Sequence, residues 1–152
     1  MSTSLTTAEQ LLAVMPLLNR IMAVELRQET GDDTTMPQFR VLSYLVEEPL
    51  TMSAIARKRH VSFQSAGELV QALVERGWVV RMPDPTDRRQ SLLHLTDVGL
   101  AQYERAQRHM LERLASFMDQ LDENEKTTIQ QALQSLHRVL VQEVISEHDS
   151  RD

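Results

Sequence analysis

The charged segment at residues 83–90 contains the side chains whose spacing best suits binding chemistry. It reads PDPTDRRQ, a turn-rich loop with two arginines near its tip. Arginines on such a tip can reach phosphates, or enter an A·T-rich minor groove whose narrow width concentrates negative potential. Asp87 lies two residues before Arg89, close enough to hold its guanidinium through a forked contact. The alternative is an exposed salt bridge that contributes little energy.

A second set of polar residues lies on the helix that we expect after Ser62. The face opposite Leu69 and Leu73 carries Ser62, Gln64, Ser65 and Glu68. Gln64 has the groups to read adenine, and Glu68 can accept a hydrogen bond from cytosine N4. Serines here, and the basic residues ending the preceding helix, suit phosphates. The alternative is a solvated helix face. The candidate DNA contacts are Ser53, Arg57, Lys58, Arg59, Ser62, Gln64, Ser65, Glu68, Asp87, Arg88 and Arg89.

The distribution of charge favours a nucleic-acid partner more than the total does. The 152 residues carry a net charge of −6, which by itself argues against such a partner. Residues 50–96, however, contain seven basic and four acidic residues, a net charge of +3 that leaves −9 for the rest. A basic middle within an acidic frame is typical of a DNA-binding lobe on an acidic scaffold. Chance clustering on a solvated face is the alternative.

Other chemistries find little support in the sequence. There is no cysteine, which excludes disulfides, thiolate zinc sites and iron–sulfur clusters. The five histidines lack tight ligand spacing, so we predict no metal and no cofactor. Phosphate-binding, dinucleotide-binding, hydrolase and metalloprotease motifs are missing, so we do not expect an enzyme. Without an 18-residue apolar run or a signal peptide, we expect no membrane span and a cytoplasmic location.

The elements that must position these residues are mostly helices in one domain, residues 1–152. Apolar residues recur at intervals of three and four. We expect a first helix opened by a capping box from Thr6 to Glu9 and a second beginning at Pro37. A third, capped by Thr51, should cover 52–59, and a fourth should be capped by Ser62 and ended by Gly77. Residues 78–82 and 91–95 read as strands of a hairpin. Helices joined by a brief turn and followed by a hairpin predict a winged helix-turn-helix over residues 37–96.

The terminal helices, residues 6–30 and 97–146, have more apolar surface than one small lobe can cover. A two-fold dimer is the simplest arrangement that buries it. The stripe expected to form the dimer interface consists of Ile129, Leu133, Leu136, Leu140 and Val144. The fold class is therefore mainly α with a small β-hairpin wing, the winged lobe being flanked by long dimerisation helices. From Ser146 to Asp152 we expect a polar, frayed tail.

Residues 50–99 resemble the MarR family of bacterial transcription regulators. The family's wing signature, D-x-R-D-x-R leading into L-T-x-x-G, corresponds to Asp84–Arg89 followed by Leu95, Thr96 and Gly99. The segments PQFRVL at 37–42 and LVERGWV at 73–79 also fit the family. Two segments differ from the family pattern: in the wing signature the first arginine is Thr86, and the recognition helix carries Gly67 and Glu68.

The resemblance implies a homodimeric, sequence-specific regulator that binds an inverted-repeat operator in double-stranded DNA. It also implies a repressor relieved by a small aromatic or anionic effector, with Asp87 positioning Arg89. The effector would occupy a crevice lined by Met22, Met36, Arg40 and Tyr44, where Arg40 can pair with a carboxylate. Simple packing beside a surface arginine is the alternative for that site. The alternative function is a winged-helix protein-interaction module with weak or no DNA binding.

Overall fold

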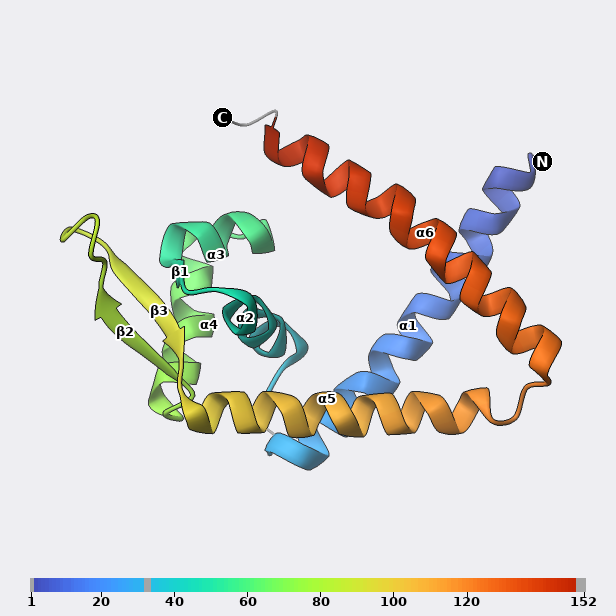
Figure 1. Cartoon of the computed structure of the whole chain (residues 1–152), viewed down its shortest axis with the longest axis horizontal. Helices are drawn as coiled ribbons and strands as arrows, with labels where there is room; N and C mark the ends of the chain where they lie inside the picture. Colours follow the sequence, from blue (N-terminus) through green and yellow to red (C-terminus); the bar gives the residue numbers. More distant parts are fainter. Residues whose placement is uncertain (1, 32–33, 150–152) are drawn as a thin grey trace. The chain divides into compact units, whose positions relative to one another are not determined.

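The computed structural model describes residues 2–31 and 34–149, with side chains up to residue 144. The chain divides into two units, Met1–Leu111 and Glu112–Asp152, and each is described by itself. Within the described residues the helices are α1 (Thr3–Thr30), α2 (Met36–Glu47), α3 (Met52–Arg59), α4 (Phe63–Glu75), α5 (Asp97–Met118) and α6 (Glu123–Asp149) (Figure 1). The strands are β1 (Leu50–Thr51), β2 (Val79–Pro83) and β3 (Ser91–Leu95). The mainly helical fold with a small hairpin is confirmed.

The first unit contains the winged lobe, in which α2, α3 and α4 pack against a small antiparallel sheet. The strand order is β1-β3-β2, with Leu50 paired to Leu93 and Val79 to Leu95. The sequence predicted only the β2–β3 hairpin and a cap at Thr51. Strand β1 was missed because a two-residue strand has no alternation to detect. The core of the lobe includes Val41, Leu42, Ile55, Val70, Leu73 and Leu93, all at most 1% exposed.

Short polar residues fix where the helices of the lobe begin and end. The Thr51 hydroxyl accepts from the Ala54 N–H, and the Ser62 hydroxyl accepts from the Ser65 N–H, so both predicted caps are confirmed. Between α3 and α4 the chain turns at His60, whose φ of 52° is left-handed. Gly77, with φ of 74°, follows the end of α4, a conformation that glycine adopts without steric cost.

Several predicted boundaries need correction. Helix α1 begins at Thr3 and is capped by Ser2; the predicted capping box at Thr6 lies inside the helix because nothing before it interrupts helical hydrogen bonding. A capping box between Thr35 and Gln38 starts α2 at Met36, one residue before Pro37. Strand β2 covers 79–83 rather than 78–82. Helix α6 continues through Asp149 where fraying was expected, and residues 150–152 lie outside the described ranges.

A tight junction joins the base of the wing to the first turn of α5. The Thr96 hydroxyl donates to the Gly77 carbonyl at 2.6 Å and accepts from the Gly99 N–H at 3.0 Å. The Trp78 carbonyl accepts from the Thr96 N–H at 3.0 Å, and a Cβ at Gly99 would overlap that carbonyl. The L-T-x-x-G pattern therefore has a physical cause: threonine caps α5, and glycine permits the close approach.

A second, smaller core lies where α1, α2 and the first part of α5 meet. Leu26, Phe39, Ala106 and Met110 are buried there, with the Phe39 and Tyr103 rings stacked at 5.0 Å between centroids. At its edge, Glu29 on α1 contacts Arg105 at 3.6 Å and His109 at 3.1 Å, both on α5. These contacts fix α1 and α5 on the α2 side of the lobe.

The second unit contains the end of α5 and helix α6. A capping box opens α6, because the Asp122 carboxylate accepts from the Glu125 N–H and the Glu125 carboxylate accepts from the Asp122 N–H, both at 2.9 Å. Along α6, Leu133, Leu140 and Val144 are 56–58% exposed. Three residues of the predicted apolar stripe therefore face solvent in the single chain, whereas Ile129 and Leu136 are half-buried.

Candidate DNA-binding surface

Two aspartates fold the tip of the wing. Asp84 Oδ1 accepts from the Thr86 N–H at 2.9 Å and from the Thr86 hydroxyl at 2.8 Å. These bonds to the charged form hold the pKa of Asp84 below its ordinary value. The Asp84 N–H donates to the Gln90 carbonyl at 3.1 Å, closing the loop. Thr86, where the family pattern has an arginine, therefore contributes to the shape of the tip.

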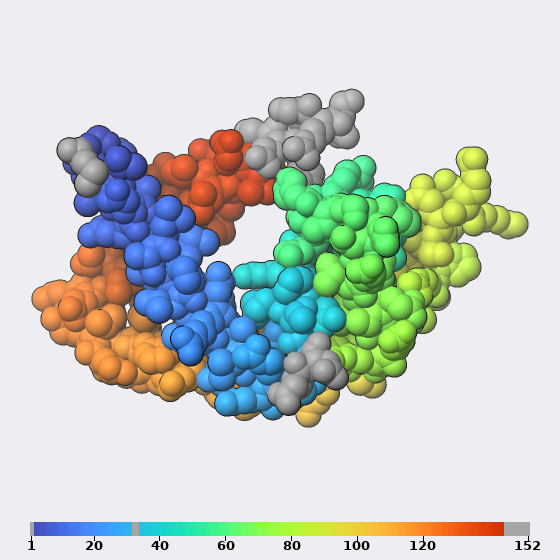
Figure 2. Space-filling model, turned by 180° about the vertical axis from the view of Figure 1, so that it is seen from behind, coloured from blue at the N-terminus to red at the C-terminus, as the bar shows by residue number. Residues whose placement is uncertain are grey.

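The expected Asp87–Arg89 pairing is present in a different geometry. Asp87 Oδ1 accepts from the Arg89 N–H at 3.0 Å and lies 3.5 Å from the Arg89 Nε, so one oxygen serves both the backbone and the side chain. This replaces the expected fork because the short tip brings the backbone N–H to the carboxylate first. The Arg89 side chain is 93% exposed. Figure 2 shows the yellow wing tip projecting beyond the green α3–α4 surface of the same unit. Asp87 thus holds Arg89 at a projecting point.

The predicted polar face of α4 is open to solvent. Ser62, Gln64, Ser65 and Glu68 are all exposed, while Ala66, Val70 and Leu73 on the other side are buried. The Ser62 hydroxyl is already used as the N-cap and also donates to the Ser65 hydroxyl at 3.0 Å. Gln64 and Glu68 are therefore better placed than Ser62 to meet an approaching base edge.

The basic residues at the end of α3 differ in their surroundings. Arg57 is exposed, whereas Lys58 is half-buried with its ammonium 5.5 Å from the centre of the Tyr44 ring. Arg59 is also half-buried and lines a cavity of about 400 Å³ with Ser65 and Glu68. All three cations lie in the last turn of α3, where a positive charge favours the helix dipole. Lys58 and Arg59 differ from Arg57 in being partly buried against the lobe.

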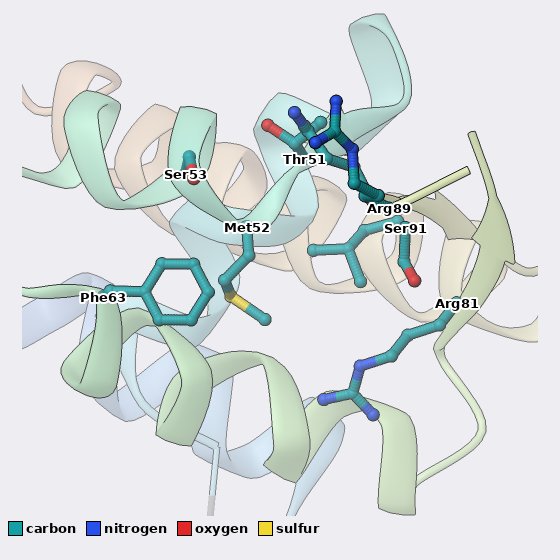
Figure 3. Close-up of a pocket in the computed structure, with 9 residues that line it drawn as sticks. Thr51, Met52, Ser53, Phe63, Arg81, Arg89 and Ser91 are labelled. Atoms are coloured by element: carbon teal, nitrogen blue, oxygen red, sulfur yellow. The ribbon is translucent and has the colours of Figure 1, made fainter. Parts of the chain in front are cut away.

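Between the wing and the start of α4 lies another cavity, of about 390 Å³. Ser53, Arg89 and Ser91 belong to its lining, as do Phe63 and Arg81, which the sequence did not suggest. Figure 3 shows the Phe63 ring beside Met52, and the Arg81 side chain reaching from β2 toward α4. Arg81 Nη2 donates to Gln71 Oε1 of α4 at 3.0 Å. A basic residue within a hairpin strand was the available signal for Arg81.

The sequence did not indicate Phe63 as a surface residue, because helical periodicity places it on the same side of α4 as the buried residues. It lies three and seven residues before Ala66 and Val70, yet it is 63% exposed because it lies one turn beyond the end of the core. Among the six aromatic side chains, all within the described ranges, it alone is exposed. This exposed ring shares the lining of the cavity with Arg81 and Arg89.

Three of the four candidate effector residues pack on two different clusters, and the fourth is exposed. Met22 and Met36 pack against the small core of Leu26, Phe39, Ala106 and Met110, whereas Tyr44 packs against the lobe core. Arg40 is exposed on α2. Burial raises the pKa of Tyr103 above its ordinary value, and the positive charge of Arg40 opposes that rise. Arg40 and Tyr103 are therefore close enough to interact electrostatically.

These features of the fold and of its surface define a class of protein. Two helices joined by a turn, a polar face on the second, and a hairpin with an arginine at its tip make a winged helix-turn-helix, an architecture typical of DNA-binding proteins. No helix in the described ranges combines the length and apolar character needed to cross a membrane.

Comparison with known proteins agrees with this class. A profile of the MarR family matches residues 32–90. A transcriptional regulatory protein for the hcr operon of Thauera aromatica is 30% identical over 110 residues, which cover 72% of this chain and 66% of that protein. The crystal structure of RV1404 from Mycobacterium tuberculosis has a TM-score of 0.82 at 26% identity, covering 91% of this chain and 95% of that one. The chain belongs to the MarR family.

A relative solved with DNA has the same fold. Streptococcus pneumoniae FabT, crystallised in complex with DNA, has a TM-score of 0.74 at 21% identity, covering 91% of this chain and 98% of that one. At this identity the likeness establishes the shared fold.

Proposed function

We propose that this chain is a homodimeric regulator that binds an inverted-repeat operator in double-stranded DNA. The observation that carries the proposal is the wing tip, where Asp87 holds a 93%-exposed Arg89, together with the exposed polar face of α4. A helix for the major groove and an adjacent arginine for the minor groove are the two parts that sequence-specific winged binding requires. FabT, which shares the fold, was crystallised in complex with DNA, and this supports DNA as the partner.

The dimer is supported by the exposed apolar face of α6. Leu133, Leu140 and Val144 are each more than half exposed, and His137, Leu140, Val141 and Val144 line a cavity of about 230 Å³ on the same helix. Contiguous apolar surface of this kind marks an interaction site. A second copy of the chain, related by a two-fold axis, would cover it with the same residues and space two recognition helices about 10 base pairs apart.

We also propose that the regulator is a repressor released by a small aromatic or anionic effector near Met22, Met36, Arg40 and Tyr44. Arg40 supports this because it is an exposed cation beside aromatic residues of α2 and α5. Benzoate and its hydroxylated forms are suitable probes. We expect them to release DNA from the native protein and to lose that effect in Arg40→Ala, with Arg108→Ala, which alters an exposed arginine on α5, as the matched control.

The test of DNA binding is a salt titration on fragments of mixed genomic DNA. If the dimer neutralises roughly six to ten phosphates, log K should fall against log salt with a slope of about −5 to −9. Sequencing the retained fragments should reveal an inverted repeat. A flat salt response, or no retention at low salt, would favour the protein-interaction module instead.

A further inference from the structure

One side of α4 carries a glycine that nothing in the lobe requires. Gly67 lies inside the helix, and a Cβ built there would meet no atom of another element within 4 Å. Its φ is not in the left-handed region, unlike those of Gly31 and Gly77. Glycine is among the least favourable residues within a helix. Gly67 therefore weakens the helix without relieving any internal contact.

The neighbours of Gly67 identify the side of the helix on which it lies. Phe63 is one turn before it and Gln71 is one turn after it, so the three residues form a line along α4. Gln71 accepts a hydrogen bond from Arg81 of β2, and Phe63 lines the cavity shared with Arg81 and Arg89. This line, which we call the wing-side strip, therefore faces the space between α4 and the wing.

Both apolar and polar side chains line that space. The Phe63 ring supplies an apolar wall, while Arg81, Arg89, Ser53 and Ser91 supply cations and hydroxyls (Figure 3). A nucleic-acid strand offers the two matching kinds of surface, apolar sugar faces and charged phosphates. When a helix occupies the major groove and a wing the neighbouring minor groove, the strand that separates the two grooves must pass between them.

We infer that one DNA strand of each half-site lies along the wing-side strip, and that Gly67 is the position where its backbone approaches α4 most closely. Arg81, held by Gln71, contacts a phosphate of this strand, and the Phe63 ring packs on a sugar. The absent side chain at position 67 provides room for the strand. This inference rests on the proposed DNA binding and adds the strand, its path and the residues that position it.

The test separates binding from folding by making position 67 larger with good helix formers. In Gly67→Ala the thermal midpoint should rise by about 2 °C, while affinity for the selected operator should fall about tenfold. Gly67→Leu should retain at least the native midpoint and lose roughly a hundredfold, because bulk rather than charge causes the loss. The salt slope should remain that of the native protein in both variants. Ser116→Ala, a similar change on the exposed part of α5, should leave affinity unchanged.

A second variant tests the phosphate contact independently. Arg81→Ala should weaken binding and make the salt slope shallower by about 1 per subunit, whatever the base sequence. The inference is overturned if Gly67→Ala binds the operator as tightly as the native chain, or if it lowers the thermal midpoint. It is also overturned if Arg81→Ala leaves the slope unchanged. A native chain that binds no duplex would instead overturn the proposed function itself.

Discussion

The winged lobe and helix α6 both carry apolar stripes, but only the lobe buries its own. In the lobe, Ile55, Val70 and Leu73 have no exposed surface. On α6, Leu133, Leu140 and Val144 remain more than half exposed. The lobe is therefore completed by its own chain, whereas α6 has apolar surface still to bury. The comparison separates two kinds of residue: those that maintain the fold, and those available to a partner.

The largest effect should come from removing apolar bulk from α6. Changing Leu136 and Leu140 together to Ala truncates four leucines per dimer, each worth about 1.5–3 kcal/mol when fully buried. Allowing for incomplete burial, we expect the dimer to lose about 4 kcal/mol or more, enough to give monomers at micromolar concentration in sedimentation. Gln131→Ala, on the opposite side of α6 at 100° per residue, is the control. A double variant that remains fully dimeric would show that Leu136 and Leu140 of α6 do not hold the dimer together, and would contradict the contrast drawn between the lobe and α6.

A smaller effect should follow from Arg89→Ala at the wing. Because Arg89 is almost wholly exposed, its removal should leave thermal stability nearly unchanged while binding weakens by about 1–3 kcal/mol per half-site. The salt slope should become shallower by about 1 per subunit. Operator affinity at several salt concentrations measures both quantities, with Arg108→Ala as the control for net charge. Unchanged affinity would remove the wing from the binding surface.

Asp87→Ala should reproduce part of the Arg89 loss, about 1 kcal/mol per half-site. Deleting a negative charge near DNA should tighten binding if electrostatics alone mattered. Loss is expected instead, because Asp87 accepts from the Arg89 N–H and contacts its Nε. The measurement is operator affinity of the folded dimer at two salt concentrations. Tighter binding at both would show that Asp87 does not position Arg89.

The smallest effect that we expect is a change in the pKa of Asp84, the second aspartate of the wing tip. The pKa of Asp84 is lowered mainly by the hydrogen bond from the Thr86 N–H and then by that from the Thr86 hydroxyl. A lowered pKa means that these bonds contribute fully above the ordinary value of 3.8 and are lost as pH falls through the lower, folded value. In an NMR titration, Thr86→Val should move the Asp84 midpoint up toward 3.8. A midpoint unaffected by that change would show that the hydroxyl has no part in the lowering.

The sequence predicted most of the lobe because its signals are local. Thr51 and Ser62 are side chains that cap the helices they precede, and their bonds need no distant partner. Strand β1 was missed because its only evidence is the pairing of Leu50 with Leu93, more than forty residues away. The capping box at Thr6 failed for a related reason: a local motif does not start a helix that has already begun at Thr3.

The candidate surface could be predicted only in part. The wing arginines followed from a loop with a recognisable charge pattern. The different surroundings of Lys58 and Arg59 did not, because they depend on Tyr44 and on the packing of α3 against α4. The exposure of Phe63 depends on where the core ends along α4, which helical periodicity alone does not specify. Arg81 joined the surface through a contact between a strand and a helix.

The junction at Thr96 couples the orientation of the wing to that of α5. The Thr96 hydroxyl is hydrogen-bonded to the backbone of both Gly77 and Gly99. Because residue 99 has no side chain, its backbone lies directly against the Trp78 carbonyl. A helix joined this tightly to the base of a hairpin transmits its tilt to both strands together. Arg89 lies at the far end of that hairpin. We therefore expect a small rotation of α5 about the Thr96 junction to produce a larger displacement of Arg89 at the tip.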